Sequence, residues 1–240
     1  MMYKNFFVKN MNKIILVFLL TINFIFQRYN VPHDKTLIGE FLLEYNERRF
    51  LAIYVGIFLI GLFPIFKNVF KTEYVTRISE KWRVCWLIWK GVAVISLLYA
   101  FLVSFGWYII VGLSIPNGLN KNYLIYMFYT FIKQVIGWFE IGIIEAFIYI
   151  MVHNLLLAFI FCYSLLILMN LSLYISSKEQ VLQYVRLFDF MFSPSDNIGL
   201  YKNFSIGMFH VVIICLLILA SYEIIKRHDY LLGGKWKYAD

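Results

Sequence analysis

Two carboxylates interrupt an apolar stretch in the middle of the chain, Glu140 and Glu145 in the segment WFEIGIIEAF. An ionisable side chain inside a membrane is costly unless it is paired or hydrated, so such residues are candidates for function. Five residues apart on a helix, the two point about 140° away from each other and do not form an acid/base pair on one face. We expect Glu140 to lie near the exterior interface in contact with water, and Glu145 to face the interior of a helical bundle.

His153 and Asn154 are the only pair of polar residues deep in the apolar run that follows Glu145. His153 lies eight positions after Glu145, within about 80° of it around a helix, so the two side chains can contribute to one cavity. One interpretation is that Glu145, His153 and Asn154 belong to a substrate path. The simpler interpretation is a polar contact between neighbouring helices.

The chain has none of the common motifs for hydrolysis or metal binding. Neither GxxxxGK[ST], GxSxG nor HExxH occurs. The cysteines, Cys85, Cys162 and Cys215, share no CxxC spacing, and the four histidines are scattered, so neither a disulfide framework nor a zinc site is predicted. We expect a protein that is not an enzyme and has no cofactor or bound metal. Any ATP-driven work then needs a second protein.

The most basic connection between apolar runs extends from Lys67 to Arg83. By the positive-inside rule it marks the cytoplasmic side. Its centre alternates bulky and charged residues at roughly helical spacing, which favours a cytoplasmic helix that docks a cytosolic partner. The residues that we expect to contact that partner are Tyr74, Arg77, Ile78, Lys81 and Trp82. The alternative is that the basic residues only determine topology.

Composition indicates an integral membrane protein. Hydrophobic residues make up 62% of the 240 residues and charged residues only 15%, whereas about a quarter of the residues in soluble domains are charged. The net charge of +8 comes from Lys and Arg at the ends of apolar runs, where lipid head groups explain it. We therefore expect contact with a lipid bilayer and no nucleic acid.

The apolar runs predict an all-α, polytopic protein whose residues 1–240 form a single bundle of six transmembrane helices. A short amphipathic lead, 1–13, precedes the first span, and both termini are predicted to be cytoplasmic. The run 135–172 is too long for one crossing, so we place a tight bend at His153–Asn154 and treat 123–134 as an interfacial approach. An amphipathic segment, Val181–Phe192, is expected in the last exterior connection. The predicted spans are 14–27, 50–67, 84–112, 135–152, 155–175 and 204–225.

This order of features resembles the permease subunits of type 2 ATP-binding-cassette exporters, in particular small bacterial permeases associated with bacteriocin or lantibiotic export and self-immunity. The run TRISEKWRVCWLIWKGVAVISLLYAFL is similar to the place where those proteins carry an Arg, a basic-aromatic pair and the third span. Arg77, Lys81 and Trp82 fill these positions here.

The resemblance implies a half-transporter, a multi-pass protein of the bacterial cytoplasmic membrane. It would pair with a second permease copy or a sister permease and with two cytosolic ATPase subunits, which contact the connection between spans two and three. The substrate path would run between the two permeases. The rival interpretation is a polytopic accessory or sensor protein that transports nothing.

Overall fold

The computed structural model describes residues 21–22, 51–69, 81–112, 121–175, 187–192 and 200–227. Within these ranges every residue except His153 and Asn154 is helical, so the all-α prediction is confirmed for the described part of the chain. The elements, in chain order, are a π-helical turn η1 (Leu51–Val55), α4 (Gly56–Val69), α6 (Lys81–Gly112), α7 (Lys121–Val152), α8 (Leu155–Ile175), α10 (Leu187–Phe192) and α11 (Leu200–Arg227).

Three described segments are long and apolar enough to cross a membrane: Trp82–Gly106, Leu124–Val152 and Asn203–Lys226. Two shorter apolar helices accompany them, Ile53–Lys67 and Leu155–Leu168. These helices give the chain the character of a membrane protein. The predicted lead and first span, 1–13 and 14–27, lie outside the described residues apart from 21–22, and the count of six spans stays a prediction.

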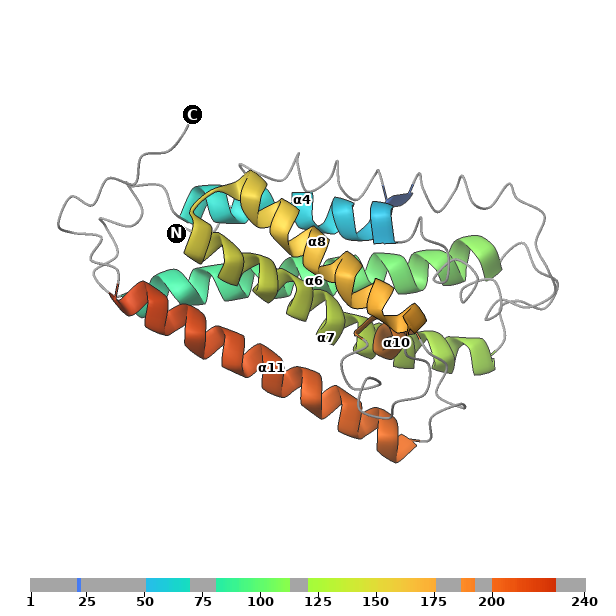
Figure 1. The fold of residues 1–240 in the computed structure, drawn as a ribbon. Coiled ribbons are helices and arrows are strands. Elements are labelled where there is room, and N and C mark those ends of the chain that lie inside the picture. Colours follow the sequence, from blue (N-terminus) through green and yellow to red (C-terminus); the bar gives the residue numbers. More distant parts are fainter. Residues whose placement is uncertain are drawn as a thin grey trace.

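Consecutive long helices alternate in direction (Figure 1). α4, α7 and α11 run one way along the bundle, and α6 and α8 run the other way. The ends of α4, α7 and α11 therefore meet the starts of α6 and α8 at one end of the molecule. This arrangement is expected when neighbouring helices are joined by short connections.

The structure corrects the prediction for the fourth span. α7 begins at Lys121 rather than at residue 135, so the segment expected to approach the membrane along its interface is the first part of a continuous 32-residue helix. Lys133 and Gln134, which suggested an interruption, are both buried in the bundle. The helix continues through both residues, although neither amide atom of Gln134 has a hydrogen-bond partner among the described residues. At about 1.5 Å per residue α7 is longer than a hydrocarbon core requires.

The predicted bend between α7 and α8 is confirmed. His153 has a φ of 57°, a left-handed conformation that ends the first helix. The side-chain oxygen of Asn154 then accepts hydrogen bonds from the backbone amides of Leu156 at 2.9 Å and Leu157 at 3.2 Å. Asn154 is thus the N-cap of α8, which explains why a polar pair interrupts the apolar run here.

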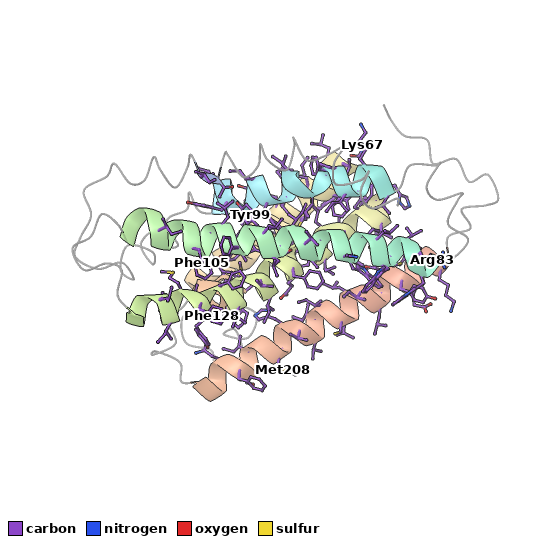
Figure 2. The ribbon with its side chains drawn as sticks, turned by 180° about the vertical axis from the view of Figure 1, so that it is seen from behind. Lys67, Arg83, Tyr99, Phe105, Phe128 and Met208 are labelled. Carbon is purple, nitrogen blue, oxygen red and sulfur yellow. The ribbon has the colours of Figure 1, made fainter. Side chains whose placement is uncertain are left out.

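An aromatic cluster packs α4, α6 and α7 together. The Trp138 ring lies 4.9 Å from that of Phe58 and 4.8 Å from that of Tyr99, centroid to centroid. The Tyr99 hydroxyl donates a hydrogen bond of 2.8 Å to the backbone oxygen of Tyr54, and Figure 2 shows Tyr99 between α4 and α6. These contacts fix the orientation of α7 and thereby decide which of its polar residues face α11.

Candidate functional site

Polar residues on α7 and α11 occur at matching heights along two helices that run in the same direction. Lys133 and Glu140 are seven residues apart on α7, and Asn203 and His210 are seven residues apart on α11. Seven residues make about two helical turns, so each pair shares one face of its helix. All four residues are at most 3% exposed. We call these four residues the α7–α11 seam.

Glu140 and His210 are in direct contact across the seam. The Oε2 atom of Glu140 lies 2.8 Å from the Nδ1 atom of His210, and both side chains are almost completely buried. The expectation that Glu140 is solvated near the exterior interface is therefore wrong. α11 packs on the face of α7 that carries Glu140 and supplies the opposing polar group.

The short helix α10 covers this contact. The Phe190 ring packs against the His210 ring in a tilted arrangement, with a centroid distance of 4.9 Å and an interplanar angle of 31°. A Cβ atom at Gly207 would lie 3.4 Å from Phe190, and a Cβ atom at Gly137 would lie 2.3 Å from Met191. Glycines at the same height on α7 and α11 thus leave room for two side chains of α10.

The described side chains of α10 are buried in the bundle. They belong to Leu187, Phe188, Phe190 and Met191, and helical spacing places them within an arc of about 160° around the helix. α10 therefore packs one side into the bundle. The rest of the predicted amphipathic segment, 181–186, lies outside the described residues.

Lys133 introduces a positive charge into the same seam. Its ammonium nitrogen lies 5.0 Å from the centre of the Tyr129 ring, a distance at which the ring stabilises a cation. Lys133 and Glu140 are about 10 Å apart along the helix axis. The seam therefore combines a cation, a carboxylate and an imidazole, all buried.

Glu145 lies on a different face of α7, inside the bundle. It is 0% exposed, which agrees with the expectation that it faces the interior. Neither of its carboxyl oxygens has a hydrogen-bond partner among the described residues. Glu140 and Glu145 thus occupy separate environments, as their spacing predicts.

The three residues predicted to belong to a substrate path do not gather into one buried cluster. Glu145 is buried, whereas His153 is exposed at the bend. Asn154 caps α8 through its side chain. The participation of these residues in transport stays a prediction.

Most of the predicted docking residues, Tyr74, Arg77 and Ile78, lie outside the described residues. Lys81 is the first residue of α6. The side chain of Trp82 is half-exposed, and its ring lies 5.1 Å from that of Trp89 and 5.3 Å from that of Tyr222 in α11. Trp82 therefore sits at the corner where α6 starts and α11 ends.

Sequence reasoning missed His210, Lys133 and Asn203 as site residues. The available signal was the repeated seven-residue spacing of polar positions in two apolar runs, with Gly137 and Gly207 placed between them. Nothing in the sequence states that the two runs pack together. Within the described ranges, no three His, Cys, Asp or Glu side chains are grouped to hold a metal ion.

Similarity to other proteins adds no information on function. No protein-family model, curated protein or solved structure matches this chain. The functional assignment rests on the residues of the chain and on their geometry.

Proposed function

We propose that this chain is the membrane-embedded permease subunit of an ATP-driven exporter, with a separate cytosolic ATPase supplying the energy. The observation that carries the proposal is that the two helix ends flanking the basic connection lie together with the end of α11. Figure 2 shows Lys67, near the end of α4, and Arg83, near the start of α6, at the same end of the bundle. α11 ends there too, with Lys226 and Arg227 as its last residues.

The contacts of Trp82 support a mechanical role for this connection. Its ring packs against Trp89 within α6 and against Tyr222 of α11. A displacement of the connection would therefore act on two membrane helices at once. Half of the Trp82 side chain is exposed. An aromatic residue that becomes buried when a partner binds, with basic residues around it, is a common basis for docking.

The proposed cargo class is a peptide antibiotic, by the resemblance to lantibiotic permeases. The substrate path would run between two permeases. α11 has an exposed apolar face that can contact lipid or a second copy of the chain. The large exposed hydrophobic residues of this face are Phe204, Met208, Phe209, Val211, Val212, Leu216 and Leu219.

Copurification with the ATPase encoded by a neighbouring gene tests the proposal. Ile78→Asp or Trp82→Asp should abolish copurification while membrane insertion is retained, because a buried carboxylate replaces an apolar anchor. Lys235→Ala, in the tail after the last helix, is the control and should change little. Copurification that survives Ile78→Lys unaltered would remove this connection from the mechanism.

A non-transporting accessory or sensor protein is the second candidate, favoured by the closed contact between Glu140 and His210. Vesicles that contain the chain and the ATPase distinguish the two. ATP-dependent movement of a peptide substrate supports the permease. Stable ATPase binding without any transport supports the accessory protein.

A further inference from the structure

We propose that Glu140 and His210 form a proton-binding site inside the bundle and that α10 is the lid that covers it. The ligand is a proton taken from water. The proposal does not depend on whether an ATPase binds the chain. It rests on the contact across α7 and α11, on the packing of α10 and on the charges in the seam.

The geometry of the contact makes the two residues one site. The two side chains are 2.8 Å apart. One proton can therefore lie on the imidazole, opposite a carboxylate, or on the carboxyl group, opposite a neutral imidazole. Both arrangements have no net charge. Removing this proton leaves one uncompensated negative charge in a buried place, and adding a second leaves one positive charge. Each change is costly in a dry interior. The two groups therefore act as one site for a single proton.

The surrounding charges decide which change opens the site. Lys133 on the same face of α7 is a buried cation, so a second proton on the pair adds to a positive charge that is already present. Loss of the proton would instead leave a negative charge on the pair, which the positive charge of Lys133 offsets. Asn203 is neutral, and Glu145 points about 140° away from Glu140. By sequence, α10 and α11 carry two further charged residues, Asp189 and Lys202. Acidification is thus the change that destabilises the closed arrangement.

The packing of α10 makes it suited to be the lid. It has only six residues, and Phe190 lies directly against the His210 ring. Met191 occupies the space that Gly137 leaves on α7, and Phe190 occupies the space beside Gly207 on α11. Moving α10 outward breaks these side-chain contacts and leaves the backbone hydrogen bonds of α7 and α11 intact. Water then reaches the pair.

A single cysteine at Gly207 reports the position of the lid. The full chain, with Cys85, Cys162 and Cys215 replaced by alanine and with Gly207→Cys, is placed in lipid nanodiscs that expose both faces. The rate of labelling by a charged, membrane-impermeant maleimide is measured from about pH 8 to about pH 5. The same cysteine in a chain with Glu140→Gln and His210→Asn is the reference, because it carries the pH dependence of the reagent alone.

The expected result is slow labelling at neutral pH and a rise of roughly tenfold, relative to the reference, as the pH falls. If the ratio of the labelling rate to that of the reference does not change with pH, Glu140 and His210 are not the proton-binding site. If labelling is rapid at every pH, α10 is not a lid.

A cross-link supplies a second readout that does not depend on maleimide access. Gly137→Cys with Met191→Cys places two thiols at the contact between α7 and α10, since a Cβ at Gly137 lies against Met191. Disulfide yield should be high at neutral pH and fall on acidification relative to the same pair with Glu140→Gln. Equal yields at all pH values would contradict the proposal, even if the double substitution at Glu140 and His210 prevented folding.

Discussion

At the residue scale, α7 carries two buried carboxylates whose surroundings differ. Glu140 has an imidazole 2.8 Å from its oxygen, whereas Glu145 has no hydrogen-bond partner among the described residues. Both are at most 2% exposed. Because the free energy of a buried charge depends on its partner, the same substitution should have opposite effects at the two positions.

His210→Ala should destabilise the protein by about 3–5 kcal/mol, because it leaves Glu140 buried without its partner. The double variant with Glu140→Gln and His210→Asn should lose less, since no uncompensated charge remains. Thermal unfolding in detergent micelles measures both. Glu140→Gln alone and His210→Asn alone complete the cycle. A loss in the double variant equal to the sum of the two single losses would show that the pair is not coupled.

Glu145→Met should leave stability unchanged or raise it by about 1–3 kcal/mol, because it removes a buried carboxyl group that no described residue satisfies. The same unfolding measurement applies, with Glu140→Met as the matched variant that should be destabilised. If Glu145 belongs to a transport path, Glu145→Met should lose transport while remaining folded. A strong loss of stability would instead reveal a structural partner for Glu145.

At the element scale, the position of α10 depends on two glycines of its neighbouring helices, which leave space for its side chains. The closest approach is at Gly137, where a Cβ atom would lie 2.3 Å from the Met191 side chain, which is fully buried. At Gly207 the nearest atom of Phe190 would be at 3.4 Å, an ordinary contact. The two glycines therefore face the same helix with different tolerance.

Gly137→Ala should displace α10 at a cost of about 1–3 kcal/mol from overpacking, partly offset by the better helix propensity of alanine. Gly207→Ala should be neutral or slightly stabilising. Unfolding in micelles gives the difference. In a chain that already carries Met191→Ala, adding Gly137→Ala should cause no further loss of stability. A neutral Gly137→Ala would mean that Met191 moves aside freely and does not seat α10.

At the scale of the whole molecule, the alternating helix directions determine which connections share a side (Figure 1). The end of α4, the start of α6, the bend between α7 and α8 and the end of α11 lie together. The end of α8 and the start of α11 lie toward the other end. By the positive-inside rule, the basic residues at the first of these ends predict that it faces the cytoplasm.

Cysteine labelling of intact cells tests this orientation. A membrane-impermeant reagent should modify a cysteine placed at Asp34 or Asp196 and should not reach one at Glu80. These positions lie outside the described residues, so the expectation comes from charge and helix direction. Permeabilised cells provide the control in which all three react. Labelling at Glu80 in intact cells would reverse the topology.

The sequence by itself determined the features that depend on local composition. Hydropathy identified the apolar helices that form α6, α8 and α11, because the transfer of a long apolar segment into lipid depends on that segment alone. The polar pair at His153–Asn154 located the bend, because a left-handed residue followed by an N-cap is a local device. The angle between Glu140 and Glu145 likewise follows from helical geometry.

Only the tertiary structure decided where polar residues are tolerated. Lys133 and Gln134 looked like an interruption, yet they lie within α7, because the cost of burying a polar group depends on what packs against it. Glu140 looked solvated, yet it contacts His210, a residue from the last helix. The covering of this pair by Phe190, which belongs to a third segment, also depends on the space beside Gly207 on α11. Such contacts join residues far apart in the chain, and their free energies exist only once the helices have packed.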